Sequence, residues 1–139
     1  MFNTRMLQAA EKYLRRGKLT AAIVRYERVV ERNPRDLTAA NALGDLYVRA
    51  GRRDAAASVF FTIAERLYSE GFLRRAAAMF KKVINLEPGS IDALARLSIA
   101  EAAAFLETVA LSESQRRIAD RILEEIRERL RFLLDVGLD

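Results

Sequence analysis

Residues 40 to 60 read ANALGDLYVRAGRRDAAASVF, and this stretch decides the fold. Its apolar residues recur at spacings of three and four, which is the period of one face of an α-helix. Gly51 interrupts the pattern at the point where a first helix should stop. Ala56 and Phe60 then continue a second helical period. The stretch therefore predicts two helices that are joined by a tight turn.

The same features occur earlier in the chain at an offset of 34 residues. The offset aligns residues of the same kind at four positions: Tyr13 with Tyr47, Gly17 with Gly51, Ala22 with Ala56, and Tyr26 with Phe60. Recurrence at one fixed period of this length is typical of stacked helix pairs, each of which is unable to bury its apolar face alone. The chain is therefore predicted to be a helical repeat array.

A second self-comparison gives a shorter offset of 20 residues. It aligns Gly51 with Gly71, Ala56 with Ala76, Phe60 with Phe80, and Ile63 with Val83. An offset of 20 is too short for a complete helix pair. It predicts that the helix at 54–70 closes one pair and also opens the next, so that two successive repeats overlap.

These positions resemble the tetratricopeptide repeat family, whose pattern is W-x2-L-G-x2-Y, A-x3-F and P. The second unit matches best, with Leu43, Gly44, Tyr47, Ala56 and Phe60 in place. Alanine replaces the tryptophan at position 40, and Tyr68 stands at the proline position. The other two units match in part, through Tyr13, Gly17, Ala22, Tyr26 and Pro34 in the first, and Gly71, Ala76, Phe80 and Pro88 in the third.

The resemblance implies an all-α fold, a right-handed helical-repeat solenoid of antiparallel helix pairs with a C-terminal capping helix. About seven helices are expected, near residues 4–16, 20–32, 36–50, 54–70, 73–86, 91–110 and 113–134. We expect a single domain over 1–139, divided into repeats at 3–36 and 37–70, an overlapping repeat at 57–90, a degenerate repeat helix at 91–110 and the cap at 111–139. Asp36, Asp54 and Ser90 are candidate N-caps, because their side-chain oxygens accept hydrogen bonds from a first turn.

The last predicted helix carries an apolar stripe, and we interpret it as the side that packs on the repeats. Its members are Ile118, Ile122, Ile126, Leu130 and Leu133. A capping role is favoured because terminal repeats of such stacks need a polar outer face. The alternative is a dimerisation helix, which requires heptads sustained over three or four repeats.

The composition removes several classes of function. The chain contains no cysteine and no histidine, which excludes thiolate chemistry, disulfides and the usual zinc, copper and haem ligands. We expect no catalytic residues, no metal and no cofactor, and hence a chain that is not an enzyme. No stretch approaches the roughly 20 apolar residues of a membrane span, and no export signal is recognisable at the start. A cytoplasmic protein is therefore expected.

Positive charge is concentrated in the first part of the chain. Residues 1 to 53 hold 12 basic and 5 acidic side chains, whereas the net charge of the whole chain is +5. Such a region attracts nucleic acid or an anionic surface through its field. This electrostatic binding is the alternative to the function that the repeat resemblance implies.

The resemblance implies a scaffold or adaptor that binds a segment of another protein in a concave groove. The first helix of each pair lines this groove in the family, which selects Glu11, Arg15, Thr38, Asn41, Asp45, Val48, Arg49, Phe61, Glu65, Tyr68 and Arg96. The lysine and asparagine with which some members grip a peptide's terminal carboxylate are replaced by Leu7 and Glu11. We therefore expect an internal segment of a protein partner, and a monomer or weak homodimer.

Overall fold

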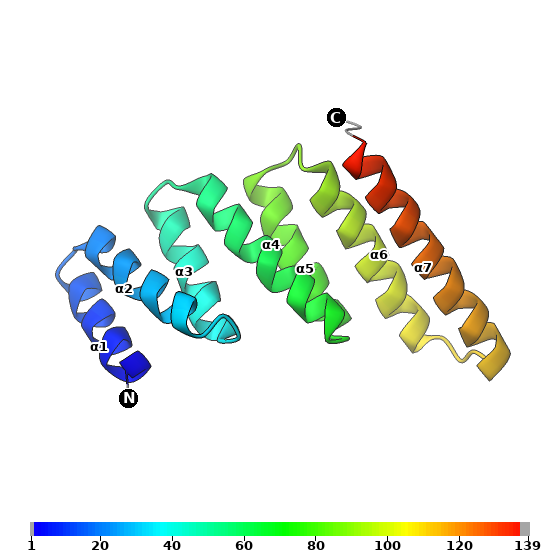
Figure 1. The fold of residues 1–139 in the computed structure, drawn as a ribbon, viewed down its shortest axis with the longest axis horizontal. Helices are drawn as coiled ribbons and strands as arrows, with labels where there is room; N and C mark the ends of the chain where they lie inside the picture. Colours follow the sequence, from blue (N-terminus) through cyan, green and yellow to red (C-terminus); the bar gives the residue numbers. More distant parts are fainter. Residues whose placement is uncertain (1, 137–139) are drawn as a thin grey trace. The chain divides into compact units, whose positions relative to one another are not determined.

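The computed structural model describes residues 2–136, and within them every regular element is an α-helix (Figure 1). The helices are α1 Phe2–Arg15, α2 Leu19–Arg32, α3 Leu37–Arg49, α4 Arg53–Ser69, α5 Leu73–Leu86, α6 Ile91–Thr108 and α7 Glu113–Asp135. The predicted all-α helical-repeat class is confirmed, and each boundary falls within two residues of its predicted place. Residue 1 lies outside the described residues. So do residues 137–139, which form the end of the predicted cap.

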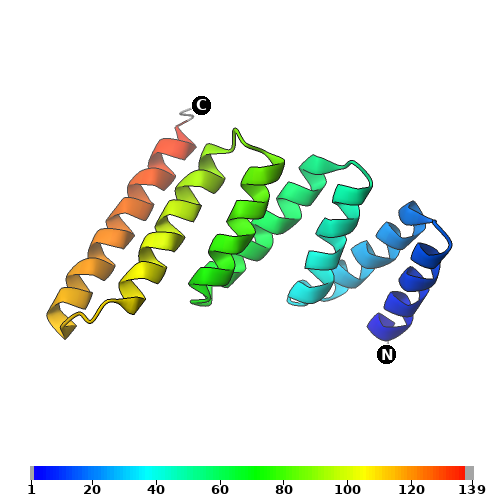
Figure 2. The same ribbon diagram turned by 180° about the vertical axis from the view of Figure 1, so that it is seen from behind.

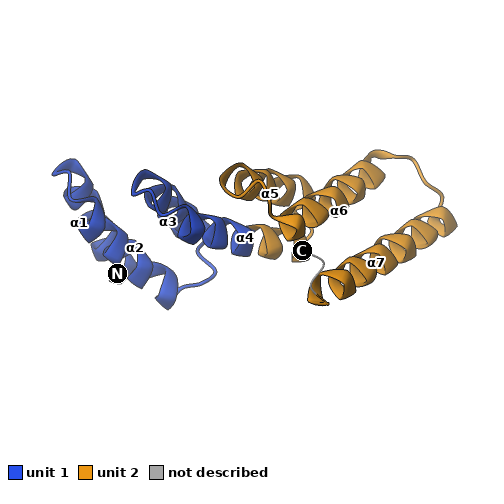
Figure 3. Cartoon of the chain, turned by 90° about the horizontal axis from the view of Figure 1, so that it is seen from above, with its two compact units in different colours: residues 1–63 blue, residues 64–139 orange. Residues whose placement is uncertain are grey.

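The chain divides into two compact units, Met1–Ile63 and Ala64–Asp139 (Figure 3). The division falls inside α4, the helix that the sequence assigns to two overlapping repeats. Each unit is described by itself below. The assignment of residues 1–139 to a single domain, with repeats at 3–36, 37–70 and 57–90, stays a prediction.

Three turns are alike down to their hydrogen bonds, and each contains a glycine. Gly17, Gly51 and Gly71 have φ angles of +72°, +74° and +86°, a region that side-chain-bearing residues rarely adopt. In each turn the amide that follows the glycine donates to the carbonyl five residues earlier, over 2.9 Å: Lys18 to Tyr13, Arg52 to Tyr47, and Phe72 to Leu67. This is the Schellman arrangement, which ends a helix by satisfying its free carbonyls. The offsets of 34 and 20 residues are thus offsets between equivalent turns.

The two proline-containing turns are also equivalent. Asn33 and Glu87 have nearly the same backbone angles, and in each turn a proline, Pro34 or Pro88, stands three residues before the first residue of the next helix. Asp36 and Ser90 then cap α3 and α6 by accepting from the amides of Ala39 and Ala93, which confirms both as N-caps.

The third predicted N-cap, Asp54, is wrong. Asp54 lies inside the first turn of α4, because that helix already begins at Arg53. An unpredicted cap begins α7 instead. Ser112 accepts from the amide of Gln115, and the side chain of Gln115 accepts from the amide of Ser112, which together form a capping box.

In the first unit, the core lies where small residues let helices approach one another. Helix α2 packs against both α1 and α3, and Ala22 and Val29 are fully buried. Gly44 of α3 faces the ring of Phe60 of α4 so closely that a Cβ atom at position 44 would lie 2.5 Å from the ring. The glycine of the repeat pattern is therefore required by packing at this position.

In the second unit, α5 packs closely on α6, and Phe80, Val83, Ala93 and Ala100 form the core between them. Helix α7 runs beside α6 in both ribbon views (Figures 1 and 2). It contributes no buried residue, although it is the longest helix of the described residues. Among those residues, no helix combines the length and the apolar character that crossing a membrane requires.

The predicted apolar stripe of α7 is only partly the packed side, which corrects the sequence interpretation. Ile118, Ile122, Ile126 and Leu133 are between 41% and 59% exposed, so most of the predicted stripe faces solvent. The better covered apolar residues of α7 are Ala119, Leu123, Leu130 and Leu134, all of them half-buried. Helix α7 therefore has two apolar sides, and α6 covers only one of them.

Candidate functional site

The predicted groove residues of α3 share one exposed side of that helix. Thr38, Asp45, Val48 and Arg49 are exposed and Asn41 is half-buried, whereas Leu43, Gly44, Leu46 and Tyr47 face the core. Spacings of three and four residues place these five positions on adjoining turns of the helix. The side offers an amide, a hydroxyl, both charges and one apolar surface, which suits contact with a protein segment.

The predicted residues of α1 and of the first part of α4 are placed differently. Glu11 and Arg15 are both exposed on α1. Burial raises the pKa of the Tyr26 phenol on α2, and the negative charge of Glu11 raises it further, which places Glu11 in the electrostatic neighbourhood of α2. Phe61 is half-buried in α4 and is already engaged in a contact. It therefore presents only part of its ring to a ligand.

In the second unit, the structure joins two of the predicted residues directly. One guanidinium nitrogen of Arg96, on α6, donates to both carboxylate oxygens of Glu65, on α4, each over 2.8 Å. The Nε atom of Arg96 donates to Asp92 over 2.9 Å. Burial by itself would lower the pKa of Arg96. The hydrogen bonds and negative charges of Asp92 and Glu65 have the larger combined effect, so the pKa is raised above its usual value. Arg96 is thus a fixed, half-buried cation that joins α4 to α6.

Tyr68, one helical turn after Glu65, is held by α7. The guanidinium carbon of Arg127 lies 4.3 Å from the centroid of the Tyr68 ring, and Arg127 also donates a hydrogen bond to the Tyr68 hydroxyl. A cation over an aromatic face is attracted by the ring quadrupole, and the attraction grows as the pair loses water. Arg127 also lies 3.6 Å from Glu124. The contact joins the end of α4 to α7.

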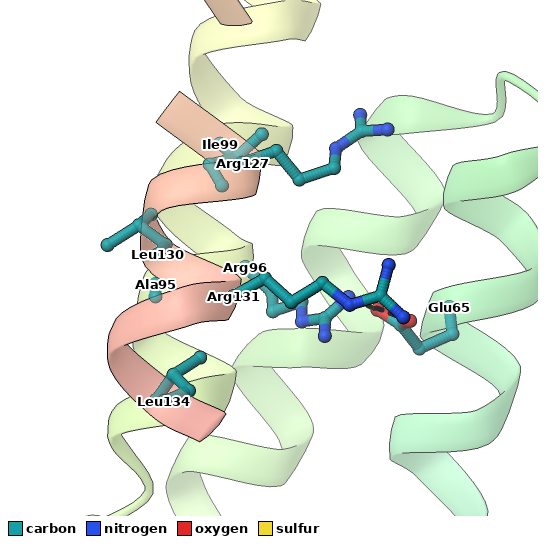
Figure 4. A pocket seen from close by; sticks show the side chains of 8 residues that line it. All are labelled: Glu65, Ala95, Arg96, Ile99, Arg127, Leu130, Arg131 and Leu134. Carbon is teal, nitrogen blue, oxygen red and sulfur yellow. Dashed lines mark hydrogen bonds and ion pairs between the residues drawn. The ribbon is translucent and has the colours of Figure 1, made fainter. Parts of the chain in front are cut away.

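These contacts border a pocket of about 170 Å³ between α4, α6 and α7 (Figure 4). Glu65 and Arg96 form its polar side, and Ala95, Ile99, Leu130 and Leu134 form its apolar side. Arg127 and Arg131 extend from α7 in the direction of the helix that carries Glu65 (Figure 4). The pocket therefore combines aliphatic surface with several guanidinium groups.

The residues that α7 contributes to the pocket are missing from the sequence prediction. The predicted cap at 111–139 contains all four of these residues, Arg127, Leu130, Arg131 and Leu134, and its predicted packed stripe includes only Leu130. A second stripe at Ala119, Leu123, Leu130 and Leu134, with spacings of four and seven, was the signal that could have revealed the packed side. Two competing stripes on one helix leave its orientation open until a partner helix is placed.

A second polar cluster lies in the first unit and is part of its packing. The Tyr47 hydroxyl donates to Glu27 over 2.6 Å, and the Arg52 guanidinium lies 4.6 Å from the centroid of the Tyr47 ring. Burial, followed by the hydrogen bond to Glu27, raises the pKa of Tyr47 from its usual value of 10 to about 12. The cluster joins α2, α3 and the turn after α3, because its members come from all three.

Neither the pocket nor the side of α3 presents a catalytic arrangement. Across the described range, no group of three or more His, Cys, Asp or Glu side chains is placed to hold a metal ion. The pocket contains guanidinium groups, one carboxylate and aliphatic side chains. Such groups bind and orient a partner through charge-assisted hydrogen bonds and apolar contact.

Comparisons with known proteins give two kinds of similarity. The tetratricopeptide repeat model matches residues 13–70. Part of the chain is similar to UvrABC system protein A. It is 38% identical over 85 residues to the protein from Streptomyces avermitilis, covering 55% of this chain and 8% of that protein. It is 48% identical over 71 residues to the protein from Bradyrhizobium diazoefficiens, covering 50% and 7%. The chain therefore spans less than a tenth of the length of these relatives.

Proposed function

This chain is a tetratricopeptide repeat protein, and we propose that it is a scaffold that holds a segment of another protein against its exposed helix sides. Repeats of this family generally mediate interactions between proteins. The observation that supports a particular site is the pocket between α4, α6 and α7. It combines an apolar side with fixed charges, which is the composition of sites that give affinity and orientation together.

The proposal includes binding without catalysis, in the cytoplasm. It assigns the pocket as one anchor and the exposed side of α3, at Thr38, Asn41, Asp45 and Arg49, as a second contact surface. The similarity to UvrABC system protein A covers 8% or less of the relatives compared, so we carry none of that protein's activity over to this chain.

The test is affinity capture from the native host, with mass spectrometry and then titration of each purified partner. One variant carries Leu130→Ser in the pocket, and a second carries Asn41→Ala, Asp45→Ala and Arg49→Ala on α3. A matched control replaces three exposed residues elsewhere in the first unit, Arg28, Glu31 and Arg35, with alanine. We expect the pocket variant to weaken binding at least about tenfold, as is usual for central contact residues, and the control to leave it unchanged. The proposal is contradicted if both site variants bind the same partners with unchanged affinity while their circular dichroism spectra show that the fold is intact.

Nucleic-acid binding by the basic first part of the chain is the alternative, and it is not favoured. Two arginines of that region already cover tyrosine rings, Arg25 on Tyr13 and Arg52 on Tyr47. Salt separates the two functions, because phosphate binding weakens steeply as salt rises from about 50 to 200 mM. We expect weak binding of mixed-sequence single-stranded DNA and RNA, and a partner affinity that changes little over this range. A steep salt dependence of tight nucleic-acid binding would favour the alternative.

A further inference from the structure

The three arginines that line the pocket differ in how their charges are used. Arg96 is bonded to Glu65 and Asp92, and Arg127 is held by Tyr68 and Glu124. Arg131 forms no hydrogen bond or ion pair within the described part of the chain. Its nearest acidic neighbours in sequence on α7 are Glu128 and Asp135, and neither of them pairs with it. The Arg131 side chain therefore extends from α7 at the pocket (Figure 4), and no described residue accepts a hydrogen bond from its guanidinium.

The pocket surface beside Arg131 is aliphatic. Leu130 and Leu134 are half-buried on α7, and Ile99 of α6 is 7% exposed. A guanidinium next to apolar surface is less well solvated than one in open water, so an opposite charge there interacts more strongly. Glu65 pairs with Arg96 through both of its oxygens, and no hydrogen bond or ion pair joins it to Arg131 in the described part of the chain.

We propose that the pocket receives an acidic side chain of the partner, whose carboxylate pairs with Arg131 while a neighbouring aliphatic residue packs on Ile99, Leu130 and Leu134. The inference rests on the proposed function and names the kind of segment that this site selects. The partner segment is an internal acidic and aliphatic one. Arg131 supplies two parallel N–H donors for the two carboxylate oxygens, which is the preferred pairing of these groups.

The occupant is a carboxylate, and the geometry favours a side chain over a chain terminus. Arg96 and Arg127 are each paired with acidic side chains of the chain itself, so among the pocket arginines Arg131 is the guanidinium that can pair with one ligand carboxylate. A phosphate, with close to two negative charges, would leave one of them unpaired beside Glu65. The apolar residues come from one turn of α6, at Ala95 and Ile99, and one turn of α7, at Leu130 and Leu134, so they suit an aliphatic side chain that neighbours the acidic residue in a continuing chain.

The experiment uses the full chain labelled with 15N, and four short peptides as probes. Two capped peptides, acetyl-Leu-Glu-Leu-Leu-amide and acetyl-Leu-Gln-Leu-Leu-amide, differ only in charge. A third is the glutamine peptide with a free carboxyl terminus, and a fourth carries phosphoserine in place of glutamate. Binding is followed by NMR titration of the arginine Nε–H resonances. The variants are Arg131→Gln and, as matched control, Arg129→Gln, an exposed arginine of α7 outside the pocket.

We expect the glutamate peptide to bind about five- to tenfold more tightly than the glutamine peptide, the range for a charge-assisted contact in a partly exposed site. Its addition should shift the Arg131 resonance. The Arg131→Gln variant should lose this preference while Arg129→Gln retains it. Equal binding of the glutamate and glutamine peptides would overturn the proposal, as would tighter binding of the free-terminus or phosphoserine peptide.

A further variant separates this inference from the proposed function. Leu130→Ser removes apolar contact without changing charge, so it should weaken the glutamate and glutamine peptides alike. If Leu130→Ser weakens a native partner and Arg131→Gln does not, the carboxylate inference is wrong and the proposed function stands. If neither variant affects any partner or peptide, the pocket is not the site and the carboxylate inference fails; the proposed function fails with it only if the triple variant of α3 also leaves partner binding unchanged.

Discussion

Helices α3 and α7 use apolar residues in opposite ways. Helix α3 has 13 residues and buries six of them, while α7 has 23 residues and buries none. Helix α3 follows the repeat pattern, in which small residues at Ala40 and Gly44 let neighbouring helices come close. Helix α7 has leucines on its packed side and Ala119 as the small residue there, and its contact with α6 is less extensive than that of α5 with α6. Burial here depends on close approach, and apolar content alone does not produce it.

The difference also explains where a binding pocket forms. Closely packed repeat helices leave little space between them, as Phe60 against Gly44 shows. The looser contact of α7 with α6 leaves a cavity at their junction with α4. The pocket therefore combines residues at repeat groove positions, Glu65 and Arg96, with residues of α7, which lies outside the repeat pattern.

The largest expected effect is that of Phe60→Ala in the first unit. The ring is 2% exposed and fills the space beside Gly44, so its removal leaves a cavity. We expect the free energy of unfolding to fall by about 3–5 kcal/mol, the usual range for a buried phenylalanine. Urea denaturation followed by circular dichroism measures it. A loss below about 1 kcal/mol would show that the first unit is not tightly packed here.

Gly44→Ala tests the same contact from the other side. An alanine is normally preferred to glycine within a helix by about 1 kcal/mol, but the added Cβ would lie 2.5 Å from the Phe60 ring. We expect a net loss of about 1–3 kcal/mol of stability, as for other overpacked cores. In a Phe60→Ala background the same change should become neutral or stabilising. A double-mutant cycle of unfolding free energies decides between crowding and an unrelated effect.

Leu123→Ala and Ile122→Ala compare the two apolar sides of α7. Leu123 is half-buried, whereas Ile122 is 50% exposed. We expect Leu123→Ala to cost about 1–2 kcal/mol, roughly half the usual cost for a fully buried leucine. Ile122→Ala should stay within about 0.5 kcal/mol of the unmodified chain. Thermal denaturation measures both changes. A larger loss of stability for Ile122→Ala than for Leu123→Ala would mean that the packed side of α7 is the stripe predicted from the sequence.

Ser112→Ala and Asp36→Ala should have similar effects despite the contrast between their helices. A cap satisfies amides of a first turn, and this local contribution does not require that the helix is buried. Each change should cost about 1 kcal/mol, measured for Ser112 by the helical signal of α7 and for Asp36 by global unfolding. A negligible cost at Ser112 would mean that α7 frays in solution and that its cap is not formed.

Among the losses of stability that we expect, the smallest is at Tyr47, on the packed side of α3, and only the control change Ile122→Ala should have less effect. Because its pKa is raised to about 12 in the fold, the protonated phenol is the form that the fold favours. Its contribution to stability is therefore fully present below pH 10, the pKa of a free tyrosine, and is lost as the pH rises through about 12. Tyr47→Phe should cost about 0.5–1 kcal/mol at neutral pH.

Ultraviolet titration checks the order of ionisation at the tyrosines. Arg25, through a hydrogen bond and its charge, lowers the pKa of Tyr13, so Tyr13 should ionise before Tyr47. Tyr47→Phe should remove the last component of the titration. If the latest component persists in that variant, the contact with Glu27 does not control it.

The sequence by itself determined the helices, their turns and the repeat offsets. These are local properties, because Gly17, Gly51 and Gly71 end helices through backbone conformation and the apolar periods define each helix. It also places Glu65, Tyr68 and Arg96 among the candidate binding residues through their positions in the repeats. The physical reason is that the position of a residue within its repeat and the apolar spacing of its helix both depend on residues within a few helical turns.

Only the tertiary structure decided which side of α7 is covered, that Glu65 and Arg96 form an ion pair, and that Arg131 reaches the pocket without a partner among the described residues. The ion pair joins residues 31 positions apart, on helices separated by another helix. Two apolar stripes on one helix have similar burial free energies in isolation, so the choice between them depends on the shape of the surface offered by α4 and α6. That surface exists only after the second unit has packed.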